Sequence, residues 1–303
     1  VSERRITIMI PLLIGIPAVL AVLFQFIRNE KARGYVVYAG AGIIMLTTVI
    51  FIVRWITGGA QTWMFYPETE LIDHLMTAGD IFLMCLIIYL SVKYGRILPI
   101  ILSVLQTAIV LYTEFTVEVA EGPHMMVDWL TILMCIIIAF IGGFICIYTV
   151  GYMKGYHHHH KDVKDRQPFF FSMLFLFLAA MFGLVLSQNL IWIYFFWEIT
   201  SVISFLMIGY TRSDEAVGNS FCALWMNLLG GLGFAVAIAL MAHLYGTLQL
   251  MDVVEIGALL PLMCLSLAGL TKSAQLPFST WLLGAMVAPT PSSALLHSAT
   301  MVK

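Results

Sequence analysis

Charged residues are scarce in this sequence. Asp, Glu, Lys and Arg make up 11% of its 303 residues, whereas 61% are hydrophobic and the mean hydropathy is +0.97. A soluble domain is about a quarter charged, so the composition excludes an ordinary soluble protein. It predicts an all-α polytopic membrane protein with lipid as its solvent. The net charge of −2 says nothing about partners, but the sequence has no basic stripe and no nucleic-acid-binding motif, so we expect no nucleic acid partner.

The sequence also lacks the motifs of metal centres and common catalytic sites. Its five cysteines lie in apolar runs without CxxC spacing, so we expect buried thiols and no cofactor in this chain; they are Cys85, Cys135, Cys146, Cys222 and Cys264. No HExxH, GxSxG or nucleophile–base arrangement is present, which argues against an enzyme acting within the membrane. No acid–histidine helix spacing frames His157–His160, and we expect a solvated loop there rather than a metal site.

Apolar segments near the length of a membrane span recur along the chain. Taking ~20 residues per span, we count about ten; they lie at 6–27, 35–56, 74–93, 97–113, 126–152, 168–186, 188–210, 218–243, 257–284 and 290–303. The start, VSERRITIMIPLLIG, has no cleavage site of small residues, so we expect a retained first helix. The last segment stops at Lys303 within a helical pattern, and we expect a fragment or a split gene product.

The loops between these segments alternate in charge. One set, 28–34, 93–96, 154–167 and 211–217, holds ten of the fifteen Lys and Arg residues. The other set, 57–73, 114–125 and 244–256, contains acids and no Lys or Arg. Because cytoplasmic loops carry the excess of Lys and Arg, the first set is predicted to face the cytoplasm and the N-terminus to lie outside.

Glu198 is a lone acid within the apolar run NLIWIYFFWEITSVISFLMIGY. An ionisable residue at a helix centre costs about 2.5–3.5 kcal/mol on insertion scales, so it must pair, take up a proton or face water. Thr200 and Ser201 follow it and can line a polar face. Two readings stay open at this point: a structural ion pair between helices, or a proton carrier.

Lys272 and Pro277 stand together in LTKSAQLPFSTWLLGAM, inside another predicted span. Proline cannot donate a backbone hydrogen bond and crowds the preceding turn, so the helix is predicted to break just after Lys272. Broken helices at membrane depth line protein-buried or wet cavities. Ser273 and Gln275 supply further polar atoms, and the lysine can exchange protons as a partner carboxylate moves. The alternative is a kinked packing helix whose lysine extends to the interface.

A histidine and a second lysine follow in APTPSSALLHSATMVK. His297 titrates near neutral pH and can relay protons, and Thr300 lies on its face of the helix. Lys303 comes six residues later. Among weaker candidates, Asp80 is expected to extend outward and Asp128 to cap a helix. The pairs 142–143 and 230–231, both Gly-Gly, are expected to allow close helix packing.

The stretches GYMKGY, FFWEITSVISFLMIGY, LTKSAQLPFSTWLLGAM and APTPSSALLHSATMVK resemble the antiporter-like subunits of the complex I superfamily. These are the large membrane subunits of respiratory complex I, Mrp-type sodium/proton antiporters and membrane-bound hydrogenases. The resemblance covers about 126–303 and favours the Mrp and Mrp-like hydrogenase branch. It implies two inverted repeats of five helices, each with a broken helix. It also implies proton-translocating roles for Glu198, Lys272, His297 and Lys303.

The chain departs from that pattern in three places. The second repeat is absent, so only the first inverted repeat is expected. The region 35–125 carries an extra helix pair. Where relatives have a lysine after the 211–217 loop, this chain has Phe221, Cys222 and Ala223. Arg212 or Lys272 would then have to serve as the exchange partner of Glu198.

These observations predict an N-terminal part, 1–125, and a truncated antiporter-like module, 126–303. We expect the chain to conduct H⁺, or exchange Na⁺ for H⁺, in a redox-driven complex of the Mrp-like hydrogenase or complex I type. Peripheral partner subunits would carry iron–sulfur clusters and, in a hydrogenase, a nickel–iron centre. One alternative is an A-type subunit of an Mrp-type antiporter without redox partners, and another is a non-conducting scaffold. The predicted location is a prokaryotic cytoplasmic membrane.

Overall fold

The computed structural model describes residues 2–66, 70–120, 122–160 and 163–302, with backbone only for 2–8 and 298–302. The chain is an all-α membrane protein of many passes. Its first helices are α1 (Ser2–Phe24), α2 (Glu30–Thr57), α3 (Glu70–Lys93) and α4 (Ile97–Thr116). A continuous helical rod follows, formed by α5 (Trp129–Ile137), the π-helical η1 (Ile138–Gly142) and α6 (Gly143–His159).

The second half of the chain supplies the centre of the bundle. It contains α7 (Gln167–Leu186), α8 (Leu190–Ile208) and α9 (Asp214–Leu240), which continues into the π-helical η2 (Met241–Tyr245). The remaining elements are α10 (Leu250–Glu255), α11 (Leu259–Lys272), α12 (Thr280–Gly284), the 3-10 turn η3 (Ala285–Val287) and α13 (Thr290–Val302). In the described ranges, seven helical segments are long and apolar enough to cross a membrane. Met9–Phe24 and Leu259–Lys272 are shorter apolar helices, so ten full spans are not confirmed.

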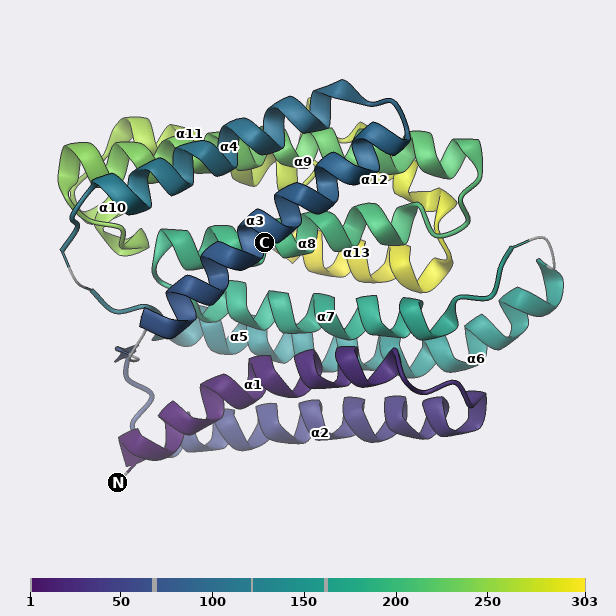
Figure 1. Ribbon diagram of the computed structural model, residues 1–303. Helices are drawn as coiled ribbons and strands as arrows, with labels where there is room; N and C mark the ends of the chain where they lie inside the picture. The colour runs from purple at the N-terminus through teal and green to yellow at the C-terminus, as the bar shows by residue number, and fades with distance from the viewer. Residues whose placement is uncertain (1, 67–69, 121, 161–162, 303) are drawn as a thin grey trace.

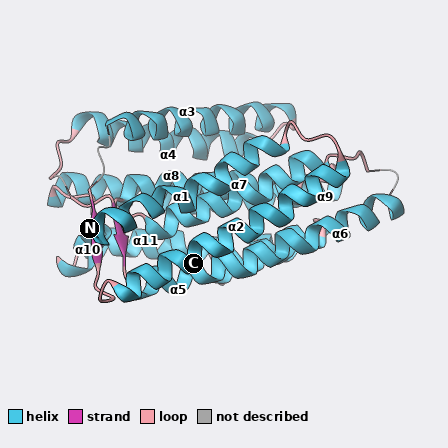
Figure 2. Cartoon of the chain, turned by 90° about the horizontal axis from the view of Figure 1, so that it is seen from below, coloured by secondary structure: helices cyan, strands magenta, loops and turns pink. Residues whose placement is uncertain are grey.

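The long helices run side by side along one axis (Figures 1 and 2). The α1–α2 hairpin packs on α7 at one side of the bundle, whereas α4 and α11 both pack on α9 at the other. Helices α7 and α8 lie between these layers. In an 18-residue apolar stretch of each, 78% of the residues are buried, whereas the figure for α3 is 22%. The centre of the bundle is therefore α7, α8 and α9.

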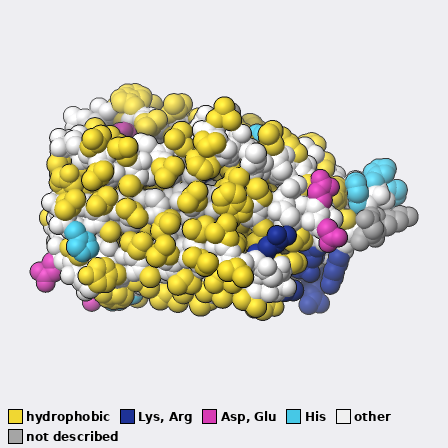
Figure 3. Space-filling model, turned by 90° about the horizontal axis from the view of Figure 1, so that it is seen from above, with side chains coloured by type: hydrophobic (Ala, Val, Ile, Leu, Met, Phe, Trp, Pro, Cys, Tyr) yellow, Lys and Arg dark blue, Asp and Glu magenta, His cyan; other side chains and the backbone are white. Residues whose placement is uncertain are grey.

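Short strands join the loops at one end of the bundle, which we call the strand end. Strand β1 (Trp63–Phe65) pairs antiparallel with β2 (Met125–Val127), with Met64 opposite Met126. Single bridges add Ser187 to Met125 and Asn189 to Gln249. The predicted lysine-free loops therefore meet at the strand end. Figure 3 shows Lys and Arg side chains gathered at the opposite end and a largely hydrophobic surface between.

Glycine pairs allow close helix packing, as the sequence predicted. A Cβ added to Gly230 on α9 would lie 1.9 Å from Thr271 Oγ1 on α11. One added to Gly142 or Gly143 would meet the side chain of Leu178 or Met45 at 2.4 or 2.5 Å. Small residues at these positions let the helices pack at short range.

Two local expectations were wrong. The residues His157–His159 form the last turn of α6 rather than a loop, because the helix continues past the apolar segment into the polar region. Of the five cysteines, Cys85 is exposed, whereas Cys135 and Cys146 are buried. In a membrane helix an apolar environment includes the lipid-facing surface, so an apolar run does not imply burial inside the protein.

Candidate functional site

Helix α8 carries Glu198 into the centre of the bundle. The helix begins after Asn189, whose side chain accepts hydrogen bonds from the backbone N–H groups of Ile191 and Trp192. Two turns later, Glu198 is buried, with 3% of its surface exposed. Its Oε2 accepts a hydrogen bond of 2.9 Å from Nε2 of Gln106 on α4. Its Oε1 has no hydrogen-bond partner in the described parts of the chain.

Lys272 is the last residue of α11, so the predicted helix break is confirmed. Its side chain is buried, with 2% exposed, and points to α8. The ammonium donates hydrogen bonds to Ser201 Oγ at 2.6 Å and to the carbonyl oxygen of Trp197 at 3.2 Å. It also lies 5.0 Å from the centre of the Trp197 ring, a cation–π distance.

Lys272 thus contacts the residues on either side of Glu198 along α8, without forming an ion pair with Glu198 itself. Trp197 precedes Glu198, and Ser201 lies one turn after it on the same face. In the described ranges the only ion pair within 4.0 Å joins His157 and Asp165. The two buried charges remain close enough to interact electrostatically. A carboxylate with a free oxygen therefore stands beside an ammonium held by neutral groups.

The break itself runs from Ser273 to Ser279. Side chains near it donate hydrogen bonds to backbone carbonyl groups of α11. Trp281 on α12 donates its indole N–H to the carbonyl oxygen of Thr271 at 2.9 Å, which satisfies one backbone group freed by the break. Ser273 donates to Gly269 at 2.6 Å within α11. Gln275 and Pro277 are exposed, so the structure does not bring Gln275 to the buried pair.

The two polar residues after Glu198 both bond back to their own helix. Thr200 and Ser201 donate to the carbonyl oxygen of Trp197 at 2.8 and 3.0 Å. Because the Ser201 hydroxyl proton is used in this way, its oxygen is free to accept from Lys272. Ser201 therefore contributes to the site directly, as the sequence suggested, whereas Thr200 lies within the buried core of α8.

The remaining sequence candidates lie on or beyond α13, which packs against α6 and α8. His297 is half-buried. Its Nε2 is buried and has no hydrogen-bond partner in the part of the chain described with side chains. The side chains of Thr300 and Lys303 lie outside the described residues, so their predicted roles stay predictions.

Arg212 does not lie at the site. It is exposed in the loop after α8, with a left-handed backbone φ of 61°. Phe221, one of the three residues in the region where the resemblance leads us to expect a lysine, packs on Phe205 with ring centres 4.9 Å apart. Of the two candidate partners for Glu198, the structure therefore brings Lys272 alone to its neighbourhood.

Sequence reasoning missed Gly231 on α9, which faces the buried carboxylate. A Cβ at this position would lie 2.6 Å from Gln106 Oε1 and 2.8 Å from Glu198 Oε1. Both distances are shorter than real Cβ contacts allow, so the glycine makes room for the hydrogen-bonded pair. The Gly-Gly signal was present in the sequence, but only the packing of α4 on α9 gives it this meaning.

We predict that Gly231→Ala destabilises the fold by about 1–3 kcal/mol, because the added methyl group would overlap Gln106 and Glu198 and force them apart. The measurement is thermal unfolding of the protein in detergent. Gly218→Ala is the matched control, since the same helix leaves open space there. Equal stability of the two variants would show that the space at Gly231 is not needed.

Asp80 and Asp128 also have clear positions. Asp128 caps α5, accepting from the backbone N–H of Thr131 at 2.7 Å, as predicted. Asp80 on α3 does not extend outward; the expectation was wrong, because this face of α3 packs against α8 and leaves the side chain 6% exposed.

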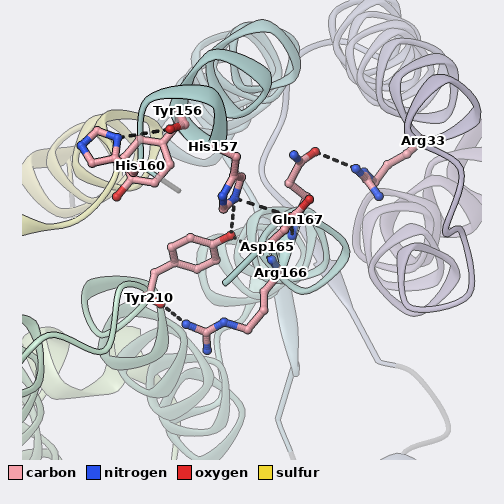
Figure 4. Close-up of polar contacts among 8 residues, drawn as sticks. All are labelled: Arg33, Tyr156, His157, His160, Asp165, Arg166, Gln167 and Tyr210. Carbon is pink, nitrogen blue, oxygen red and sulfur yellow. Dashed lines mark hydrogen bonds and ion pairs between the residues drawn. The ribbon is translucent and has the colours of Figure 1, made fainter. Parts of the chain in front are cut away.

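A second polar cluster lies at the end opposite the strands (Figure 4). The His157 ring is 3.1 Å from the hydroxyl of Tyr210 and 3.5 Å from Asp165 Oδ1. The guanidinium of Arg166 donates to the carbonyl oxygen of Tyr210. Burial raises the pKa of Tyr210 to about 12, so its hydroxyl keeps its proton at neutral pH. The cluster joins α6, α7 and the end of α8, and we read it as structural.

Two family models match the chain over the elements that build the site. The model described as NADH:quinone oxidoreductase/Mrp antiporter, transmembrane region, matches residues 187–303, from the start of α8 to the chain end. A second, described as NADH-ubiquinone oxidoreductase (complex I), chain 5 N-terminus, matches residues 122–162. These matches support membership of the chain in the complex I and Mrp antiporter superfamily. Glu198, Lys272 and His297 lie inside the longer match.

Curated relatives in the same superfamily are antiporter subunits. The chain is 39% identical over 186 residues to the putative antiporter subunit mnhA2 of Staphylococcus aureus strain JH9. It is 38% identical over the same length to mnhA2 of strain USA300 / TCH1516. Each match covers 58% of this chain but 22% of the relative. The chain therefore corresponds to about a fifth of the length of these relatives.

Proposed function

We propose that this chain forms a proton-conducting part of an A-type subunit in an Mrp-type Na⁺/H⁺ antiporter. The observation that carries the proposal is the buried pair of Glu198 on α8 and Lys272 at the end of α11, whose ammonium bonds to Trp197 and Ser201 on either side of Glu198. Unpaired ionisable groups inside a membrane protein mark ion pathways and proton relays. The names of the relatives, which are antiporter subunits without redox terms, favour the antiporter over the redox-driven complex.

In the proposed mechanism, Glu198 acts on Lys272 through its charge and not through a direct ion pair. When Glu198 is a carboxylate, its charge stabilises the ammonium of Lys272 across the short gap along α8. When Glu198 takes up a proton, that stabilisation is lost, and Lys272 is held only by Ser201 and the Trp197 carbonyl. Lys272 then gives a proton toward His297, and beyond it toward Lys303. Moving one charge against 100 mV requires about 2.3 kcal/mol of free energy. Such a change in charge pairing can supply this free energy.

Coupling to redox chemistry is the second candidate. Its support is the match of residues 122–162 to a complex I subunit. In that case peripheral partner subunits would contain iron–sulfur clusters, and a hydrogenase would add nickel. The same proton path would serve both kinds of complex, so the distinction lies in the partners and the energy source.

The test starts from the native complex, extracted in mild detergent and identified by mass spectrometry with iron and nickel analysis. We expect small hydrophobic partners without iron, together with proton release from acidified vesicles when Na⁺ is added. Iron–sulfur partners, with or without nickel, would favour the redox-driven complex. A complex that moves neither protons nor Na⁺ would indicate a scaffold and overturn the proposal.

A further inference from the structure

The two helices α3 and α4 bury polar faces inside an otherwise apolar pair. On α4, the buried face includes Ser103, Gln106, Thr107 and Thr113, with the apolar Val110 between the last two. On α3, Asp73, Thr77 and Asp80 are spaced three or four apart, and Asp80 is buried. The lipid-facing sides of both helices carry large exposed hydrophobic residues. Polar groups are expensive in lipid, so this shared polar face is a feature that needs a function.

The polar face opens at the strand end into a cavity of about 190 Å³. Asp73 and Glu114 are among its lining residues, with His124 and Trp192. The Trp192 indole donates to Asp73 at 2.7 Å, and Thr77 donates to Glu114 at 2.7 Å. Two carboxylates at the entrance of a cavity attract cations, including protons, from the adjoining water.

Asp80 lies deeper on α3 than the residues that line this cavity. It is seven residues after Asp73 on α3, a rise of about 10 Å into the bundle. It is 94% buried, since 6% of it is exposed, and its Oδ1 has no hydrogen-bond partner in the described parts of the chain. Glu198 and Glu114 both lie within electrostatic range of it. A buried carboxyl group near two others avoids the free-energy cost of a buried charge by holding a proton.

Further groups able to pass a proton lie near Asp80 and Glu198. The hydroxyl of Tyr194 is buried next to Thr107, without a hydrogen bond of normal geometry. Gln106 holds one oxygen of Glu198, and the other oxygen is without a partner in the described chain. Glu198 lies six residues into α8 from Trp192, a rise of about 9 Å, and so at a depth similar to Asp80.

We propose that α3 and α4 form a proton entry route from the strand end, in which Asp80 delivers protons to Glu198. The inference rests on the proposed function. In each transfer, the carboxyl group of Asp80 loses its proton and the carboxylate of Glu198 gains it. Asp80, now a carboxylate, then takes a proton from water in the cavity beside Asp73 and Glu114. The extra helices of the N-terminal region thereby acquire a role in transport.

The first test measures access and does not depend on transport. Met76→Cys, Asp80→Cys and Ile87→Cys are made in the full complex, and a membrane-impermeant cationic thiol reagent is added from the strand-end side. Met76 lines the cavity, and Ile87 is as buried as Asp80 but two turns deeper on α3. We expect Cys at position 80 to react at least about tenfold faster than at 87, because thiols react as solvated thiolates. Equal rates at 80 and 87 would overturn the route.

The second test measures transport. We expect Asp80→Asn to slow proton uptake from the strand end by about tenfold or more, because the amide cannot release a proton, and Asp80→Glu to restore most of it. Glu255→Gln, an exposed carboxylate at the same end, is the matched control and should leave uptake unchanged. Normal uptake in Asp80→Asn would overturn the role of Asp80. Absence of flux in the unaltered complex would instead refute the proposed function, while the labelling rates would still decide whether the route exists.

Discussion

Replacing Lys272 with alanine is expected to abolish coupled transport while the complex still assembles. The substitution removes the buried ammonium that contacts Ser201 and the Trp197 carbonyl. A proton would then have to cross an apolar gap, at a cost near the ~2.5–3.5 kcal/mol of a buried charge. Since about 1.4 kcal/mol is a factor of ten in rate, transport should fall by about a hundredfold. The measurement is Na⁺-driven proton flux in vesicles, with assembly checked by native gel.

Lys272→Arg separates charge from proton exchange. Arginine keeps the positive charge but does not release a proton at any physiological pH, so flux should remain as low as in the alanine variant. Lys93→Ala is the control, because Lys93 is exposed at the end of α3. Near-normal flux in Lys272→Arg would mean that only a fixed charge is needed at this position.

Glu198→Gln is expected to reduce transport by a similar factor. Glutamine has nearly the same shape and can keep a hydrogen bond with Gln106, but it cannot take up or release a proton. Lys272 would then lose the negative charge whose presence or absence drives its exchange. We expect flux to fall about a hundredfold by the same burial cost, with the thermal stability of the detergent-solubilised complex changed little.

A double variant that combines Lys272→Ala with Glu198→Gln tests whether the two residues act together. If Glu198 and Lys272 act as one unit, the double variant should be no slower than either single variant, because groups that work together are not additive. A double variant about a hundredfold slower again would show two separate paths. Unchanged flux in Glu198→Gln alone would reduce Glu198 to a structural residue.

The chemistry of single residues was readable from the sequence. Glu198 stood out as an acid in an apolar run, and Lys272 with Pro277 predicted the end of α11 at the right residue. These predictions succeeded because the cost of a buried charge and the backbone limits of proline are local properties. The number of membrane spans was harder to predict. The apolar helices in α1 and α11 are short, and whether they cross the membrane depends on the neighbouring helices.

Contacts between distant helices were not readable. Gln106 lies 92 residues from Glu198, and Asp80 was expected to point outward because its position near a span end permits it. A signal was present, since the polar residues of α3 lie three or four positions apart and those of α4 fall on one face of the helix. In a membrane helix such a stripe marks the side that faces protein. It does not say which helix lies opposite, and that depends on how α3 and α4 pack against α8 and α9.

The end of α11 at Lys272 has an electrostatic consequence of its own. Peptide dipoles along a helix add up, so its last turn carries a partial negative charge worth about 0.3–2 kcal/mol to a nearby cation. Lys272 occupies that turn. Its ammonium therefore retains an anionic counterpart made of backbone, which no side-chain substitution removes and no protonation neutralises. In the proposed mechanism, Glu198 would modulate a charge that the helix terminus already stabilises, so the lysine side chain could stay buried in both of its charge states.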